Sequence, residues 1–329
     1  MRKTTTTILL VVAALTFGCA YKVEMPDGFP TPEPPPHATP LPRMEYKPDA
    51  ELEKQINEIA AAAKGKVGVA AVVLETGEAA FLNADGHYPM QSVYKLPIGM
   101  AVMDQVRLGK LDLDEVVGVT KDDMVREGMR SPLRDKSPNG GEYTIRELIR
   151  LSLVESDGTA SDVLLRLVPP TDVQSYLNQI GIRDMKVVNA EKEIGKDWRT
   201  QYENYSTPTA SVELLRWLDA SRAHGPDADR HAFTEADELW HFMAISTPGP
   251  KRLRGLLPTN IIFAHKTGTG GTQNGVTGAT NDIGIVEMPG SKHLAIAVFV
   301  SDSPADEKTR EAVIAKIAKA CWDRWAKKV

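Results

Sequence analysis

Segments whose apolar residues have helical spacing and segments that have the pattern of strands follow one another along the chain. They divide it into three regions. Residues 50–65 place apolar side chains at helical spacing and end at a glycine, which predicts an amphipathic helix. Residues 66–83 predict two strands on either side of the turn dipeptide Thr76-Gly77. From residue 92 onward the helical period dominates. The predicted helices of this middle region cover residues 92–110, 144–156, 159–168, 172–181 and 209–221.

Strand patterns return in the last third of the chain, after a further helical segment that follows Trp240. β elements therefore flank a helical middle. This order predicts an α/β lobe built from both chain ends, residues 49–90 and 240–329, with an all-helical lobe at residues 91–239 inserted between them. The late elements are expected at residues 260–268, 278–288 and 293–302 as strands and at residues 309–328 as a helix.

The first 48 residues differ in composition from the rest. Residues 1–19 combine a basic start with a short apolar run, which is the pattern of a secretory signal. The dipeptide Gly18-Cys19 resembles the cleavage site of bacterial lipoproteins, whose cysteine becomes lipid-modified, although Thr16 stands where leucine is usual. Secretion without a lipid is the alternative. Residues 20–48 contain nine prolines, so we expect an extended spacer, or a leader without a role.

The charge and the histidine and cysteine content argue against several classes of partner and of site. A net charge of −5 without a dense Lys/Arg stripe argues against a nucleic-acid partner. The seven histidines form no H-x-H or H-E-x-x-H pattern, so we expect no metal site, and His265 should pack inward. Cys321 is the one cysteine besides Cys19. We therefore expect no disulfide in the mature chain and interpret Cys321 as a small core residue.

Three segments carry candidate chemistry. Residues 263–271, FAHKTGTGG, place a lysine in an apolar strand and follow it with glycines, which let a ligand or another backbone approach closely. A β-hairpin turn is the alternative. Ser92 and Lys95 share one face of a predicted helix, where a desolvated lysine can take a proton from a serine nucleophile. Residues 156–158, SDG, lie in a polar gap between helices. Each pattern alone is weak.

Taken in this order, SVYK (92–95), SDG (156–158) and KTGT (266–269) resemble the S-x-x-K, S-D-N and K-T-G signature of class A β-lactamases and penicillin-binding proteins. Gly158 departs from it, because asparagine is expected there. The resemblance extends from Asp49 to the C-terminus and implies a β-lactamase/transpeptidase-like α+β fold with an antiparallel sheet. Segments 166–182, 201–208, 249–258, 264–271 and 279–285 look most like the branch of class A that holds the extended-spectrum PER and VEB enzymes.

The resemblance implies a role for each matching residue. Ser92 matches the nucleophile that forms an acyl-enzyme, Lys95 the lysine that helps to activate it, and Ser156 the hydroxyl that passes a proton to the leaving ring nitrogen. The backbone N–H groups of Ser92 and Thr269 match the oxyanion hole. No cofactor is implied.

The resemblance also implies a substrate-binding role for the matching strand residues. Lys266, Thr267 and Thr269, with Gly268 between them, match the group that holds the substrate carboxylate. Arg252, fourteen residues before Lys266, matches an arginine that reaches the same carboxylate in the PER-like branch; a surface ion pair is the alternative. The missing asparagine at Gly158 would have offered its amide to the substrate, so we expect weaker handling of some β-lactams.

Rapid hydrolysis of the acyl-enzyme requires a glutamate that positions a water. The segment before QYENY offers Glu191 and Glu193, and its spacing in the PER-like branch favours Glu191. Two solvated loop glutamates are the alternative. Asn189 and Asn204 stand where many class A enzymes pin this loop with an arginine–aspartate pair, which predicts a different loop shape and a roomier site.

These residues predict a monomeric class A serine β-lactamase that hydrolyses small-molecule β-lactams, confers resistance, and is exported to the periplasm and held at the membrane by a lipid on Cys19. A penicillin-binding DD-peptidase or β-lactam sensor, which acylates but deacylates slowly, is the first alternative. A non-enzymatic envelope protein on the same scaffold is the second. Glu191 discriminates between the hydrolase and the first alternative.

Overall fold

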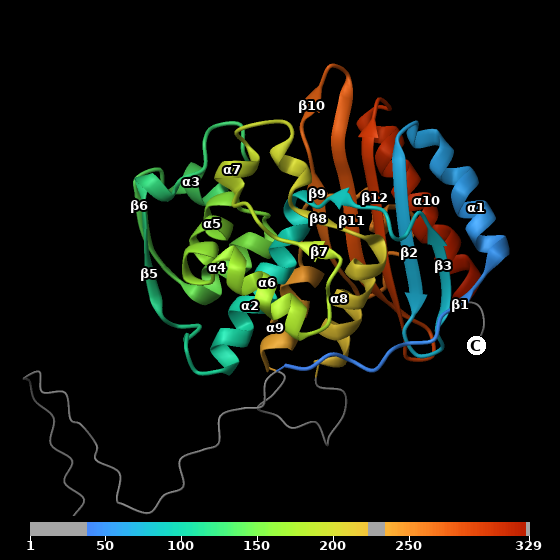
Figure 1. Cartoon of the computed structure of the whole chain (residues 1–329), viewed down its shortest axis with the longest axis horizontal. Helices are drawn as coiled ribbons and strands as arrows, with labels where there is room; N and C mark the ends of the chain where they lie inside the picture. Colours follow the sequence, from blue (N-terminus) through green and yellow to red (C-terminus); the bar gives the residue numbers. More distant parts are fainter. Residues whose placement is uncertain (1–37, 223–233, 327–329) are drawn as a thin grey trace, which may run out of the picture. The chain divides into compact units, whose positions relative to one another are not determined.

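One sheet collects strands from both ends of the chain, as the sequence predicts (Figure 1). The structure is a computed structural model that describes residues 38–222 and 234–326; the predicted signal, Cys19 and the first part of the spacer lie outside the described residues. Neighbouring strands of this sheet run antiparallel, except that β1 runs parallel to β3. The strand order is β1 (Lys47–Pro48), β3 (Glu78–Leu82), β2 (Lys66–Val73), β12 (Lys292–Ser303), β11 (Val276–Met288) and β10 (Thr272–Gln273), and β9 (Phe263–Thr269) also pairs with β11.

Helices cover both faces of the sheet, because its central strands carry apolar side chains on both sides. In β12, Ile296 packs into the core formed with α1 (Ala50–Ala60) and α10 (Glu307–Trp325). Phe299 points to the opposite face, where α8 (Pro208–Ala220) lies against β12 and β2. Alternation of side chains along a strand produces these two separate cores.

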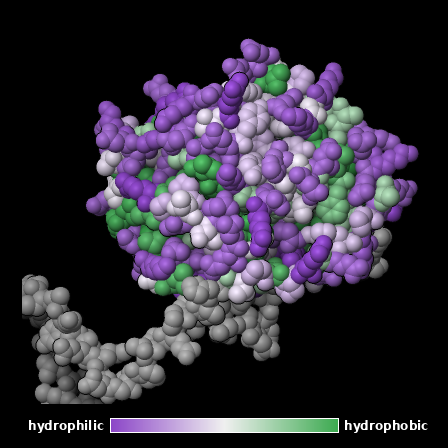
Figure 2. Space-filling view, in the orientation of Figure 1, coloured by the Kyte–Doolittle hydropathy of each residue, from purple (hydrophilic) through white to green (hydrophobic). Residues whose placement is uncertain are grey.

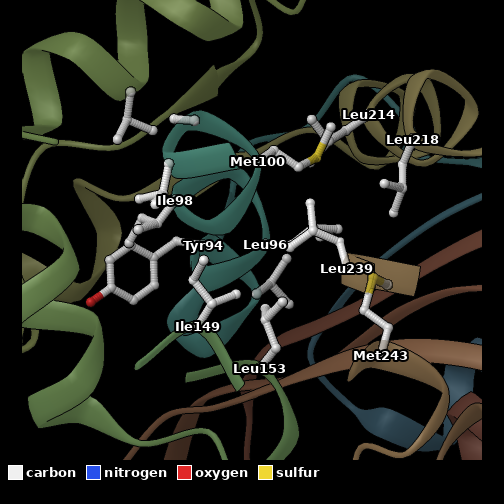
Figure 3. Packing of buried hydrophobic residues seen from close by; sticks show 14 of the residues in the cluster. Tyr94, Leu96, Ile98, Met100, Ile149, Leu153, Leu214, Leu218, Leu239 and Met243 are labelled. Atoms are coloured by element: carbon white, nitrogen blue, oxygen red, sulfur yellow. The ribbon is translucent and has the colours of Figure 1, made fainter. Parts of the chain in front are cut away.

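The second core is built around α2 (Lys95–Arg107), which is buried on nearly all sides. Figure 3 shows Leu96 and Met100 of α2 among side chains from α4, α8 and α9. Each such side chain contributes about 1.5–3 kcal/mol when it is fully buried. The remaining helices are α3 (Pro132–Lys136), α4 (Ile145–Val154), α5 (Gly158–Leu167), α6 (Pro170–Gln179), α7 (Glu191–Ile194) and α9 (Thr234–Ala244).

The inserted lobe also contains short strands, and β4 lies just before it; the helical period did not predict them. β5 and β6 form an antiparallel pair, and β4, β8 and β7 form a second small sheet. Strands of two to five residues are too short to show an alternating pattern against helical neighbours. Their bounds are Tyr88–Pro89 (β4), Val116–Thr120 (β5), Gly140–Thr144 (β6), Met185–Lys186 (β7) and Tyr205–Ser206 (β8).

The described part of the predicted spacer, residues 38–48, lies against the folded domain; we call it the strap (Figure 1). The indole N–H of Trp217 donates to the carbonyl of Thr39 at 3.0 Å, and the Arg216 guanidinium donates to that of Pro42 at 2.9 Å. The strap ends in β1, which pairs with β3. Proline removes backbone donors but not acceptors, so a proline-rich segment can still be held through its carbonyl groups.

Two predictions about buried residues are confirmed. Cys321 is fully buried in the core between α10 and the sheet, and burial raises the pKa of its thiol to about 12. His265 packs inward, with Nδ1 2.9 Å from the Asp282 carboxylate.

Hydrophilic residues cover most of the face in Figure 2. Among the described helices, none combines the length and the apolar character that a membrane span needs.

Candidate active site

Ser92 lies in a tight turn that two strands hold in place. It belongs to a 3₁₀ helix directly before α2, and the preceding residue, Gln91, has a left-handed φ of +49°. The Asn281 side chain of β11 donates to the carbonyl of Met90 at 3.2 Å. A Cβ on Gly268 of β9 would lie 2.2 Å from the same carbonyl oxygen, so β9 approaches the turn as closely as only glycine permits.

Lys95 joins two other candidate residues at the buried start of α2. Its ammonium lies 2.8 Å from the carboxylate of Glu191 and donates to the carbonyl of Ser156 at 2.9 Å. Ser156 has a left-handed φ of +58°, and its hydroxyl accepts a hydrogen bond from Lys266 at 3.0 Å. Ser156 therefore lies between the two ammonium groups, which come from a helix and a strand 171 positions apart in sequence.

Lys266 is fully buried, and its burial affects how readily its ammonium group loses a proton. Burial, together with the nearby Lys95 ammonium, lowers the pKa of Lys266 well below its usual range, while Asp282 and Glu191 oppose the shift. A bound anion such as a substrate carboxylate would favour the protonated form of Lys266.

Glu191 lies at the start of α7 and is fixed through its backbone. The Asp162 carboxylate of α5 accepts the backbone N–H groups of Glu191 at 2.7 Å and Lys192 at 3.1 Å. Burial, reinforced by the charge of Glu191, raises the pKa of Asp162 to about 7. The side chain of Glu191 is 11% exposed, whereas Glu193 is half-exposed and pairs with Lys196. Glu191 is therefore the loop glutamate that reaches Lys95.

Neutral hydrogen bonds close the base of this loop, residues 189–204. The Asn204 side-chain oxygen accepts the N–H groups of Val188 at 2.8 Å and Asn189 at 2.9 Å, and its amide donates to the carbonyl of Asn189 at 2.8 Å. The side chain of Asn189 turns away to Glu203. These three bonds of one amide stand in place of the arginine–aspartate pair, whose absence here the sequence indicated.

Arg252 is buried behind β9 and is not a surface residue. Its guanidinium donates to the carbonyl of Gly268 at 3.0 Å and to the Thr269 hydroxyl at 2.8 Å, and it lies 3.3 Å from the Glu311 carboxylate. The ion pair that the alternative interpretation expected is thus present, but it is buried. Arg252 reaches the site through Thr269 in this arrangement.

Gly158 opens α5 beside the other candidates. Its N–H donates to the carbonyl of Arg130 at 2.9 Å. A Cβ at this position would lie 3.2 Å from that carbonyl oxygen and 3.4 Å from Cγ of Glu191. An asparagine here would therefore fit closely against the Glu191 side chain.

A cavity of about 580 Å³ connects these elements, and Ser92, Lys95, Ser156, Glu191 and Thr269 all line it. Other lining residues lie in loops, in short 3₁₀ helices and in β10, and they belong to none of the three motifs, so sequence reasoning did not find them. Among these are Gln91, Arg126, Arg130, Trp198, Gln201 and Gln273.

The hairpin interpretation of the glycine-rich segment is also correct further along the chain. Residues 274 and 275 form a turn with positive φ between β10 and β11.

Comparison with known proteins decides the family. A model described as the β-lactamase enzyme family matches residues 51–325. The chain belongs to this family. The enzyme is 35% identical to β-lactamase VEB-1 of Pseudomonas aeruginosa over 278 residues, which cover 84% of this chain and 91% of VEB-1. It is 36% identical to the extended-spectrum β-lactamase PER-1 of the same organism over 281 residues, which cover 84% and 88%.

Solved structures agree with this assignment. A β-lactamase from Chitinophaga pinensis superposes with a TM-score of 0.78 at 40% identity, covering 83% of this chain and 99% of that one. The predicted class A resemblance is confirmed, and with it the fold class. The enzyme is a β-lactam hydrolase whose substrates are small molecules.

Proposed function

We propose that the enzyme opens β-lactam rings through an ester on Ser92 and so confers resistance to these antibiotics. The observation that carries this mechanism is the convergence of Lys95, Glu191 and Ser156 on the cavity that Ser92 lines. A serine hydroxyl needs an adjacent base before it can attack a carbonyl, and the buried Lys95–Glu191 pair supplies one.

Acylation follows from the contacts of Lys95 and Ser156. Glu191 accepts a proton from Lys95 across their 2.8 Å contact, and the resulting amine takes the proton of Ser92 as its oxygen attacks the ring carbonyl. The carbon–nitrogen bond of the ring then breaks. The nitrogen receives the proton through the hydroxyl of Ser156, which Lys266 contacts at 3.0 Å. Glu191 returns its proton to Lys95, so both groups recover their charges.

Deacylation is the step assigned to Glu191. Its carboxylate removes a proton from a water that attacks the ester carbon, and the proton passes back to Ser92 as the product acid leaves. During both steps the backbone N–H groups of Ser92 and Thr269 stabilise the negative oxygen. Lys266, Thr267 and Thr269 hold the substrate carboxylate, and Arg252 supports them through its bond to the Thr269 hydroxyl.

Nitrocefin hydrolysis measured beside intact-protein mass tests this scheme. Ser92→Ala should lose turnover by a thousandfold or more, on the order found for nucleophile removal elsewhere. Glu191→Gln removes the acceptor of the Lys95 proton, so acylation should be slower, but deacylation should fail almost completely, and a covalent adduct of one drug per chain should still accumulate. Glu193→Gln is the matched control, because Glu193 pairs with Lys196, and should turn over at the wild-type rate.

The same assay separates the first alternative. A wild-type enzyme that is titrated by one equivalent of drug and then stops would be a DD-peptidase or a sensor. The position of Glu191 favours the hydrolase, because Glu191 not only contacts Lys95 but also lines the cavity together with Ser92, where it can activate a water for deacylation. Wild-type turnover by Glu191→Gln would refute the role given to Glu191.

We also propose that the enzyme is exported to the periplasm, is anchored there by a lipid on Cys19, and acts as a monomer. The basic and apolar pattern of residues 1–19 and the cysteine at its end support the anchor. Mass spectrometry of the mature N-terminus tests it, with Cys19→Ser as the control that should appear in the soluble fraction. Light scattering of the lipid-free domain should give the mass of one chain.

A further inference from the structure

Gln201 contacts both chain segments that frame the oxyanion hole. It lies in the 3₁₀ helix Thr200–Tyr202 of the loop that also carries Glu191, and it is 4% exposed. Its side-chain oxygen accepts a hydrogen bond at 2.9 Å from the amide of Gln91, the residue before Ser92. Its own amide donates to the carbonyl of Trp198 at 2.8 Å, so the side chain is fixed at both ends.

Two glycines make the space that this amide pair occupies. A Cβ on Gly278 of β11 would lie 2.3 Å from the Gln201 oxygen. A Cβ on Gly270, the residue after Thr269, would lie 3.0 Å from the same oxygen and 3.2 Å from the Gln91 amide nitrogen. Neither glycine has a positive φ. The missing side chain of Gly278 therefore makes room for Gln201, whereas that of Gly270 makes room first for the backbone nitrogen of Ala279, at 2.8 Å, and then for the amide pair.

The two oxyanion N–H groups belong to Ser92 and Thr269, and Gln201 touches the chain neighbour of each. We propose that Gln201 is a positioning residue that sets the distance between these two donors, and that it does so by filling the space between Gln91 and Gly270. This inference rests on the proposed mechanism. A hydrogen-bond donor stabilises a developing oxyanion only when it lies about 2.7–3.1 Å from the oxygen, so a small change in spacing lowers the rate.

The inference predicts a specific kinetic pattern. Gln201→Ala should slow acylation about tenfold, because displacing a donor costs less than the 10²–10³-fold loss seen when one is removed. The affinity of a boronic acid, which forms a tetrahedral adduct on Ser92 with an oxygen in the same hole, should fall by a similar factor. Gln201→Met, which keeps the volume but not the bond to Gln91, should retain most of the wild-type acylation rate, because the space between Gln91 and Gly270 stays filled.

Gly278→Ala provides the independent arm of the experiment. Its new Cβ meets the Gln201 amide, so this single change should also slow acylation about tenfold. Added to Gln201→Ala, it should cost less than a further twofold, because the clash has been removed. Gly118→Ala in β5, where a Cβ would meet nothing within 4 Å, is the matched strand-glycine control and should behave as wild type.

Asn204→Ala distinguishes an effect on the spacing of the two oxyanion donors from an effect on the attachment of the loop. It breaks the bonds at the base of the loop without touching Gln91 or Gly270, and it should slow deacylation while leaving boronic acid affinity near wild type. The inference is overturned if the effects of Gln201→Ala and Gly278→Ala multiply, or if Gln201→Ala slows deacylation alone. A wild-type enzyme that forms no adduct on Ser92 would instead overturn the proposed mechanism.

Discussion

Replacing Asp162 by asparagine should change how the free energy of unfolding depends on pH. The Asp162 carboxylate accepts two backbone N–H groups at the start of α7, which favours its charged form. Burial and the neighbouring Glu191 carboxylate act in the opposite direction and prevail, so the pKa of Asp162 rises from 3.8 to about 7. The folded protein therefore holds this carboxyl largely protonated below pH 7, and ionising it costs stability.

The magnitude follows from the difference between the folded and unfolded pKa. A carboxyl whose pKa is raised on folding weakens the fold as pH rises, because the unfolded chain ionises first. The loss begins above pH 3.8 and is complete above pH 7. A shift of about three units corresponds to roughly 4 kcal/mol in all, of which about 2–3 kcal/mol falls between pH 5 and pH 8.

Asparagine does not titrate, so this part of the pH dependence should be absent from Asp162→Asn. The variant accepts with one oxygen and loses one of the two N–H bonds, a cost of about 1–3 kcal/mol that is the same at every pH. The variant should therefore be close to wild type in stability at pH 5 and more stable than wild type at pH 8.

Urea unfolding of both proteins at pH 5, 6, 7 and 8 measures this difference. Asp172→Asn, which removes an exposed carboxylate from the first turn of α6, is the control and should give a curve parallel to that of wild type. If the Asp162→Asn and wild-type curves are also parallel over this range, Asp162 titrates as an ordinary carboxyl and the reasoning from burial is refuted.

Two further predictions concern the strap and Gly158. Truncation to residue 49 should lower the free energy of unfolding by about 2 kcal/mol relative to truncation to residue 38, because the bonds from Trp217 and Arg216 are lost; equal denaturation midpoints would contradict this. Gly158→Asn should raise kcat/KM about 5- to 100-fold for some β-lactams with an acylamino group, which its amide would contact. Steady-state kinetics on a panel of drugs tests this, and identical constants for every drug would show that the account of this position is mistaken.

The fold was largely predictable because its long elements carry strong periodic patterns. The strand that contributes both Ile296 and Phe299, β12, is apolar on both faces, and the pattern placed it correctly in a sheet with the N-terminal strands. The strap was not predicted. Its proline content indicates an extended conformation, but whether such a segment is free or docked depends on donors such as Trp217, which lies 178 positions away.

Motif order placed the charged residues of the site but not its supporting contacts. Ser92, Lys95 and Lys266 belong to short sequence motifs. Because the neighbouring residues of each motif already indicate its chemistry, each of the three could be assigned a role. Gln201 belongs to no such pattern. Its position becomes meaningful only when the loop, the Ser92 turn and the end of β9 lie together, and nothing local in the sequence encodes that juxtaposition.

The glycines around Lys266 illustrate how the two levels differ. From the sequence, their small size is explained by a substrate that lies along the strand. In the structure, a Cβ on Gly268 would meet the carbonyl of Met90 and one on Gly278 would meet Gln201, while one on Gly270 would meet the backbone of Ala279 before the Gln91–Gln201 pair. The lack of side chains at these glycines therefore serves first to let the turn that carries Ser92 and the loop that carries Glu191 pack against β9. Access for the substrate follows from that packing, so substituting these glycines should disturb the alignment of Ser92 before it obstructs the ligand.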